Sequence, residues 1–269
     1  MLKIKIIHAP NEENPFLVID KPQGLPSAPL KENDDSALIQ AENLFPQINN
    51  VSGKKKIEKG LLHRIDTETR GILLIASTQK AYDEIKKCQS EGKFVKRYKA
   101  LVDFYDFENY KNNADFDDDK KIAASEILKG FPVLPRNILS QKKAFQFQSR
   151  EENEEHYEVS SFFRYFGSKR KSVRPVTKEA GRAAFKKREA KLYTTKIFVS
   201  KSKGEAFCEI SEGFKHQARC HLAWLGFPVK GDKLYNPLAV LNEKDPLRFE
   251  AVRIEFIHPL TKKAVSFEL

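Results

Sequence analysis

The segment GILLIA (71–76) is the feature of this sequence that most restricts the fold. Its residues are all apolar or glycine, without the alternation that marks a strand with one solvent-facing side. Such a run is typical of a central strand that is buried on both faces of a sheet. A second apolar run, FLVID (16–20), ends at Lys21-Pro22 and predicts another buried strand.

Two helices are predicted to accompany these strands. Asp34 or Asp35 can cap a helix that runs through about Leu44, because a side-chain oxygen at that point accepts a hydrogen bond from an unpaired backbone N–H group. Ser77 or Thr78 can cap a second helix directly after GILLIA.

The rest of the chain adds strands and one more helix. The helix is predicted over 214–225, where apolar residues recur at helical spacing on one stripe and Gly226 provides the stop. The further strands are predicted at 94–102, 194–200, 205–211, 251–257 and 264–269. Strand pairs with two or three helices, outside a strict strand–helix–strand order, predict an α+β sheet fold.

The stretch from about 104 to 190 differs in charge from the parts that flank it. It is acidic up to about residue 119 and basic from 164 onward. We expect this stretch to be an insertion or appendage within a single domain that spans 1–269. The basic block can be either a mobile, solvated segment or an arm that grips RNA, and the sequence leaves both open.

The overall charge points to a polyanionic partner. A net charge of +11 and a pI of about 9.4 favour RNA, DNA or an anionic membrane surface, although a well-solvated basic surface is the simpler alternative. The chain has only 3 cysteines and no CxxC pair, which argues against a disulfide framework and a zinc knuckle. We find no secretory signal and no apolar stretch of roughly 18 residues, so we expect a cytoplasmic protein outside the membrane.

The densest polar cluster, HRIDTETRG (63–71), lies in the loop that leads into GILLIA. Loops at the ends of rigid strands commonly present reactive groups. Asp66 lies close to Arg64 and Arg70, so its carboxylate is expected to be ionised and able to act as a nucleophile or general base. The alternative is an aspartate that caps the backbone of a turn.

A second polar cluster lies on the helix predicted over 214–225. Arg219 flanks the buried stripe of this helix and needs a carboxylate or phosphate partner, for which Asp66 is a candidate. His216 and His221 are five residues apart rather than the four typical of zinc ligands on a helix, so we expect no metal site. Both histidines can equally be ordinary helix residues.

Five segments, in this order, resemble the RluA-like family of pseudouridine synthases. DKPQGLPSAP is similar to the family's strand-Lys-Pro-x-Gly opening, and HRIDTETRGILLIAST is similar to the motif around its catalytic aspartate. The others are VKRYKALV, EGFKHQARCHLAWLGFPVKGDKLY and FEAVRIEFIHPLT. No single motif is decisive, but the five together are highly specific.

The resemblance implies a largely antiparallel central sheet with flanking helices and an active-site cleft across the sheet. It implies an isomerase that needs no metal or other cofactor and converts a specific uridine of rRNA or tRNA to pseudouridine. We expect a monomer without an N-terminal S4-type RNA-binding module.

The resemblance also assigns roles to residues. Asp66 matches the catalytic aspartate, Tyr98 the tyrosine that stacks on the target base, and Arg219 the arginine that pairs with the catalytic carboxylate. Arg64 matches an arginine near the flipped base. The remaining residues expected to bind the substrate RNA are His63, Lys21, Lys215, His216 and Gln217.

The chain departs from the family pattern at several of these motifs. Arg70 stands where the family has serine, and Glu250 stands where it has histidine. Phe214 replaces an arginine, and Lys215 can supply the missing charge. Two alternatives to the isomerase remain: a non-catalytic RNA-binding protein on the same fold, in which Asp66 is dispensable, and a glycosylase-like enzyme that releases free base.

Overall fold

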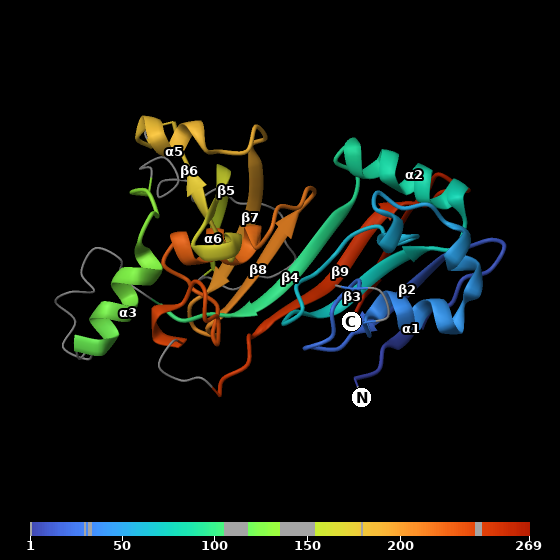
Figure 1. Cartoon of the computed structure of the whole chain (residues 1–269), viewed down its shortest axis with the longest axis horizontal. Coiled ribbons are helices and arrows are strands. Elements are labelled where there is room, and N and C mark those ends of the chain that lie inside the picture. Colours follow the sequence, from blue (N-terminus) through green and yellow to red (C-terminus); the bar gives the residue numbers. More distant parts are fainter. Residues whose placement is uncertain are drawn as a thin grey trace. The chain divides into compact units, whose positions relative to one another are not determined.

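The computed structural model describes residues 2–29, 31, 34–104, 118–134, 154–178, 180–239 and 244–269 (Figure 1). The chain forms two compact units: unit 1 comprises Met1–Tyr98 and Glu250–Leu269, and unit 2 comprises Lys99–Phe249. Strands β4 (Val95–Leu101) and β9 (Phe249–Ile257) carry the chain from one unit to the other. Unit 1 is thus built from both ends of the chain, and unit 2 from its middle.

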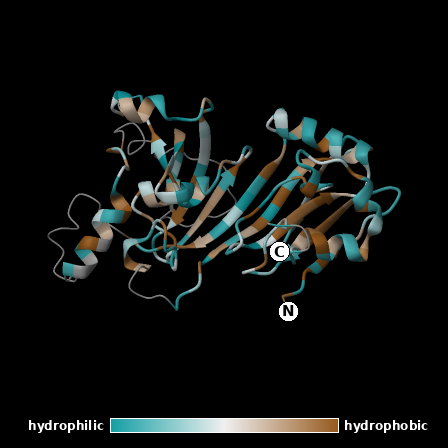
Figure 2. Ribbon diagram, in the orientation of Figure 1, coloured by the Kyte–Doolittle hydropathy of each residue, from teal (hydrophilic) through white to brown (hydrophobic). Residues whose placement is uncertain are grey.

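The strands of unit 1 are mostly antiparallel. β1 (Lys5–His8) pairs with β2 (Phe16–Lys21), β2 pairs with β3 (Arg70–Ala76), and β10 (Ala264–Glu268) pairs with β9, all in antiparallel fashion. β2 is buried throughout and β3 is buried from its second residue onward. The two predicted central strands are therefore confirmed, and Figure 2 shows both as strongly apolar ribbons.

One parallel pairing joins β3 to β9 in this unit. Its register matches Arg70 with Glu250 and Gly71 with Ala251. Gly71 has a φ of 129°, and a Cβ atom at this position would lie 2.2 Å from the carbonyl oxygen of Ala251. Only glycine lets the two backbones approach this closely.

Two helices accompany the sheet of unit 1, together with short 3₁₀ helices at Pro46–Asn50 and Lys56–Glu58. α2 (Gln79–Ser90) begins after Thr78, whose hydroxyl accepts a hydrogen bond from the Ala81 N–H group at 3.3 Å, as predicted. α1 (Ala37–Leu44) is capped by Ser36 instead of the predicted aspartates, because the Ser36 hydroxyl accepts from the Ile39 N–H group at 3.2 Å.

The two aspartates before α1 have other partners. The Asp34 carboxylate accepts a hydrogen bond from the Lys31 backbone, and that of Asp35 accepts from the side-chain amide of Gln40. The helix therefore begins one residue later than a cap at Asp35 would place it.

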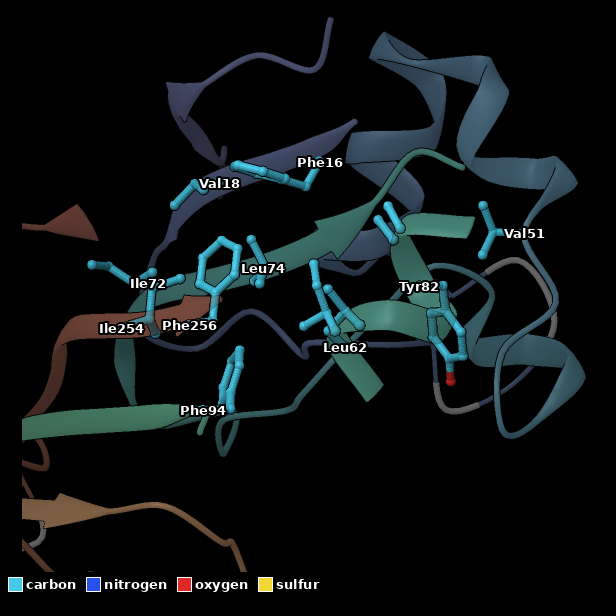
Figure 3. Packing of buried hydrophobic residues seen from close by; sticks show 13 residues of the cluster. Phe16, Val18, Val51, Leu62, Ile72, Leu74, Tyr82, Phe94, Ile254 and Phe256 are labelled. Carbon is cyan, nitrogen blue, oxygen red and sulfur yellow. The ribbon is translucent and has the colours of Figure 1, made fainter. Parts of the chain in front are cut away.

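A buried apolar cluster packs between these elements (Figure 3). It contains Phe16 of β2, Phe94 just before β4 and Phe256 of β9, with the rings of Phe16 and Phe256 in edge contact at 5.2 Å between centroids. Leu62 belongs to the same cluster. The loop that follows Leu62 is thus anchored in the core at its start.

Unit 2 contains a second set of antiparallel strands. The order is β8 (Glu205–Ile210), β7 (Tyr193–Ser200), β5 (Glu154–Phe166) and β6 (Ser172–Val176). The predicted hairpin of β7 and β8 is confirmed by its register from Lys196↔Glu209 to Ser200↔Glu205. Mostly antiparallel strands with few helices in both units confirm the α+β fold class.

The described part of the predicted insert includes two of these strands. β5 is matched to β7 from Glu154↔Ser200 to Ser161↔Tyr193, so this part is bonded into the sheet of unit 2. Helices α3 (Asp118–Leu128) and α5 (Arg182–Lys186) and a short 3₁₀ helix, η4 (Ser168–Arg170), belong to the same stretch. Most of the acidic block, residues 105–117, lies outside the described residues.

α6 (Gln217–Trp224) is shorter than the helix predicted over 214–225, and all of its residues are buried. It cannot begin earlier because His216, directly before it, has a left-handed φ of 54°. The predicted core stripe is buried at Ala218 and Leu222, but the other residues of the helix are buried as well. The predicted stop is confirmed, because Gly226 follows with a φ of 88°. No helix in the described ranges has both the length and the apolar character that a membrane span requires.

The cap of α1 makes a testable prediction about stability. Ser36→Ala should lower the free energy of unfolding by about 1 kcal/mol, because it leaves the Ile39 N–H group without its acceptor. Asp35→Ala is the matched control and should change stability by less than about 0.5 kcal/mol. Urea unfolding of both variants measures the difference, and a larger loss for Asp35→Ala would contradict the assigned cap.

Candidate active site

The segment before the predicted catalytic loop runs along β3. Leu61 bridges to Ile75, and the Leu62 N–H group donates to the Leu74 carbonyl at 3.1 Å. The Nε2 atom of His63 accepts from the Leu74 N–H group at 3.2 Å. These bonds extend the antiparallel pattern up to the point where the polar cluster begins.

The loop itself is held by residues 24–27. The Ser27 hydroxyl donates to the Ile65 carbonyl at 2.7 Å and accepts from the Ile65 N–H group at 3.2 Å. The Gly24 N–H group donates to the Thr67 carbonyl at 2.8 Å, and the Thr69 N–H group closes a turn on the Asp66 carbonyl at 3.0 Å. Asp66, which is partly exposed, therefore has fixed backbone neighbours on both sides.

Lys21 stabilises the same region from inside the protein. Its side chain is fully buried, and its ammonium group donates to the carbonyl oxygens of Pro22 at 3.0 Å, Leu25 at 2.6 Å and Thr67 at 3.1 Å. Burial lowers the pKa of this ammonium to about 8, while the carboxylates of Asp66, Glu68 and Asp20 act in the opposite direction. Because all three N–H donors are directed to the protein, this geometry suits a positioning role.

Arg70, one of the departures from the family pattern, forms an ion pair with Asp20. Its Nη2 atom lies 2.8 Å from Oδ2 of Asp20, and Nε lies 3.3 Å from both carboxylate oxygens. This hydrogen bonding raises the pKa of Arg70, and Glu250, its register partner on β9, adds a smaller effect in the same direction. Arg70 and Glu250, the two residues that depart from the family pattern here, thus have opposite charges.

The other predicted residues of unit 1 differ in exposure. The ring of His63 packs against Phe94 at 5.3 Å, its Nδ1 atom is buried, and burial holds its pKa well below the ordinary value. Arg64 is exposed and pairs with Glu58 at 3.1 Å. Tyr98 lies on β4 with 7% of its surface exposed.

In unit 2, Arg219 of α6 forms a buried, two-pronged ion pair with Asp232. Its Nε and Nη2 atoms each lie 2.8 Å from a carboxylate oxygen, and the guanidinium lies 5.5 Å from the centre of the Tyr235 ring. Asp232 Oδ1 also accepts from the Leu234 N–H group at 2.9 Å. Arg219 was expected to need an anionic partner, and Asp232 supplies one that sequence reasoning did not name.

The residues around the start of α6 fix its position. Gln217 is buried; its Oε1 accepts from the Phe214 N–H group at 3.0 Å, and its Nε2 donates to the Thr194 carbonyl at 2.9 Å. His216 Nδ1 is hydrogen-bonded to the Tyr235 hydroxyl at 3.0 Å. Lys215 is exposed, and its ammonium donates to the Arg170 carbonyl at 2.8 Å.

His221 is a structural residue of unit 2. Both ring nitrogens are hydrogen-bonded, to Ser161 at 2.9 Å and to Thr195 at 2.8 Å, and burial lowers its pKa to about 3. Within the residues that the structure describes, no group of three or more His, Cys, Asp or Glu side chains could hold a metal ion.

The predicted site residues thus fall into two sets. Unit 1 contains Asp66, Arg64, His63, Lys21 and Tyr98, and unit 2 contains Arg219, Gln217, His216 and Lys215. Sequence reasoning missed Ser27, Asp20 and Asp232 as supporting residues. All three lie in segments that resemble the family pattern: Asp20 and Ser27 in DKPQGLPSAP, and Asp232 in the Gly-Asp-x-Leu-Tyr segment.

Comparisons with known proteins agree with these motifs. A family model described as RNA pseudouridylate synthase matches residues 15–224. The chain is 23% identical to ribosomal large subunit pseudouridine synthase D of Zymomonas mobilis, over 96% of this chain and 67% of the relative. It is 21% identical to the dual-specificity RNA pseudouridine synthase RluA of Salmonella typhimurium, over 96% of this chain and 90% of the relative.

A solved structure supports the fold. The human RNA pseudouridylate synthase domain containing 1 superposes with a TM-score of 0.59 at 16% identity, covering 99% of this chain and 83% of that one. At this level of identity, the likeness concerns the fold alone.

The low pKa of Lys21 predicts a pH dependence of stability. Above pH 8 the folded protein has released a proton that the unfolded chain holds until about its ordinary pKa of 10.5, so rising pH favours folding in this window. Compared with Lys21→Met, the wild type should gain about 1.4 kcal/mol of unfolding free energy per pH unit above pH 8.

Urea unfolding of both proteins between pH 7.5 and 9.5 measures this gain. Lys3→Met, which changes an exposed lysine, is the control and should run parallel to the wild type across the whole range. If the Lys21→Met curve also ran parallel to the wild-type curve, the lowered pKa of Lys21 would be contradicted.

Proposed function

This chain belongs to the RNA pseudouridylate synthase family, and from that membership we propose that it isomerises a specific uridine of rRNA or tRNA with Asp66 as its catalytic residue. The chain is an RNA pseudouridine synthase and therefore an isomerase. The observation that carries the assignment of Asp66 is its place in the matching motif, on a turn whose neighbours on both sides are held by residues 24–27.

The proposed reaction needs no group beyond the protein and the RNA. The target uridine leaves the helical stack so that its sugar and base can be reached. Asp66 either attacks the ribose or removes a ribose proton, and the C1′–N1 bond breaks. The uracil rotates, C5 bonds to C1′, the C5 proton is lost and N1 ends protonated, so the product has the same composition as the substrate.

The rigid support of the loop suits this chemistry. A carboxylate acts efficiently when the reacting atoms are held at a fixed distance and angle, and side chains on a mobile loop lose this advantage. Lys21 and Ser27 together fix the backbone on either side of Asp66 through bonds to Thr67 and Ile65. We assign both a positioning role.

Arg219 and Tyr98 complete the proposed catalytic set. Arg219 is proposed to pair with the catalytic carboxylate, and Asp232 orients its guanidinium through two hydrogen bonds. Tyr98 is proposed to stack on the target base and to assist proton transfer. Arg64, Lys215 and His216 are proposed as RNA contacts, while His63 and Gln217 support the backbone that they bond.

The setting of the enzyme is also a proposal. The three cysteines Cys88, Cys208 and Cys220 are free and buried, which fits a reducing cytoplasm. One relative is named for the ribosomal large subunit, which supports rRNA as the substrate, and another is named for dual specificity, which supports a second class of RNA. We propose tRNA as that second class from the resemblance of the motifs. We propose a monomer, which size-exclusion chromatography with light scattering would test.

Asp66→Asn should abolish the isomerisation. The amide cannot serve as a nucleophile or base, so turnover should fall by at least roughly three orders of magnitude, while RNA affinity stays within a few-fold. The measurement is tritium release from RNA labelled at uridine C5 and taken from cells that lack this gene. Glu68→Gln, an exposed carboxylate in the same loop, is the control and should keep most of the activity.

Three results would count against the assignment. Normal release by Asp66→Asn would remove Asp66 from the catalytic role. Absence of release by the wild type, with RNA still bound, would favour the non-catalytic alternative, and release of free uracil would favour a glycosylase.

Tyr98→Phe separates stacking from proton transfer. The ring is retained, so RNA binding should be unchanged, but loss of the hydroxyl should slow product formation by about 10²- to 10⁴-fold. Single-turnover tritium release with saturating enzyme measures the chemical step directly. An unaltered single-turnover rate would show that the hydroxyl takes no part.

A further inference from the structure

The turn between β5 and β6 has an unusual backbone for its sequence. Lys169 has a φ of 51° and Arg170 a φ of 55°, so two successive residues with long side chains adopt the left-handed conformation. Side chains with a Cβ atom rarely adopt this region, and such positions cluster at functional sites when the surroundings hold them in place.

Contacts on both sides hold Arg170 in position. The ammonium of Lys215 donates to its carbonyl oxygen at 2.8 Å, and its guanidinium lies over the ring of Tyr165 at 4.9 Å from the centroid. Tyr165 in turn contacts the ring of Phe214, at 5.6 Å between centroids. The guanidinium is therefore held over an aromatic face by a cation–π contact, while Arg170 as a whole stays exposed.

The turn is strongly cationic, and the described part of the chain places no carboxylate in an ion pair with it. Lys169, Arg170 and Lys171 are all exposed, and none forms an ion pair with a carboxylate of the described residues. Lys215 is also exposed, and its ammonium is bonded to a backbone carbonyl. Elsewhere in unit 2, exposed lysines do have carboxylate partners, for example Lys191 with Glu212 and Lys201 with Glu155.

We propose that residues 167–171, with Tyr165 and Lys215, form a phosphate-binding site for the backbone of the substrate RNA, which we call the basic turn. Arg170 is its central residue, since a guanidinium oriented on an aromatic ring presents a planar pair of donors that matches a phosphate. Lys169 and Lys171 contact the adjoining phosphates. Residues 165–171 lie outside the five segments that resemble the family pattern, whereas Lys215 lies in one of them. The proposal rests on the proposed function only in taking RNA as the partner.

RNA fits this site better than an isolated anion. A single phosphate or carboxylate would satisfy one of these cations, whereas a polynucleotide presents a regular series of charges to several of them. Each phosphate contact also releases condensed counterions, so binding to the basic turn should appear in the salt dependence of RNA affinity.

The test compares four full-length variants with the wild type, using fluorescently labelled unmodified RNA over a series of salt concentrations. In Arg170→Ala, the slope of log K against log salt should decrease in magnitude by about 0.7–0.9. Arg170→Lys should keep the slope but bind about two- to five-fold more weakly, because the stacked geometry is lost, and Tyr165→Leu should behave in the same way. Arg182→Ala removes an exposed arginine outside the turn and should change the slope much less.

Tritium release at saturating RNA completes the experiment. Every variant should keep the wild-type rate, because the basic turn binds RNA and takes no part in the reaction. If Arg170→Ala and Arg182→Ala had the same slope of log K against log salt, the proposed phosphate site would be overturned. The proposed enzymatic function would be unaffected. A wild type that binds RNA but releases no tritium would instead overturn the proposed enzyme, and the slope would still decide on the basic turn.

Discussion

The buried ammonium of Lys21 is the interaction on which the geometry of the loop that carries Asp66 depends. Removing a charged amine from water is costly, and the protein offsets that cost with three backbone carbonyl oxygens from two segments that are far apart in sequence. Each of those carbonyls also gains a strong donor inside the protein. The same bonds hold the segment after β2 against the segment that carries Asp66, so neither can shift alone.

A comparable arrangement appears in unit 2, with a carboxylate in place of carbonyls. The ion pair of Arg219 and Asp232 is almost completely removed from water, with exposed side-chain fractions of 7% and 0%. Such a pair contributes little net stability, because desolvation offsets most of the attraction. The pair contributes to orientation instead, because a guanidinium that is bonded at two positions has a defined direction.

Much of this structure could be predicted from local patterns. The apolar runs of β2 and β3 predicted buried strands because burial on both faces leaves no alternation. Thr78 was one of two candidate caps, with Ser77, because both directly precede a helical pattern. The choice of Ser36 over Asp35 could not be made, since both are good caps and the backbone angle decides between them.

Local sequence patterns could not predict contacts between distant residues or strained backbone angles. The pairing of Arg219 with Asp232 depends on how the chain turns between them, which no spacing rule gives. The left-handed angles at Lys169 and Arg170 also could not be foreseen, because neither residue type favours them. The motif resemblance supplied the candidate catalytic residues, and physical reasoning alone left Asp66 open between a reactive and a capping role.

The close approach of Gly71 to Ala251 has a consequence for the order of events during biosynthesis. β3 emerges from the ribosome long before β9. The edge of β3 at Gly71 therefore stays unpaired until Ala251 has been synthesised. Contacts between such distant segments form slowly and late. The edge of β3 at Gly71 is therefore completed only after Lys99–Phe249, the whole of unit 2, have been synthesised.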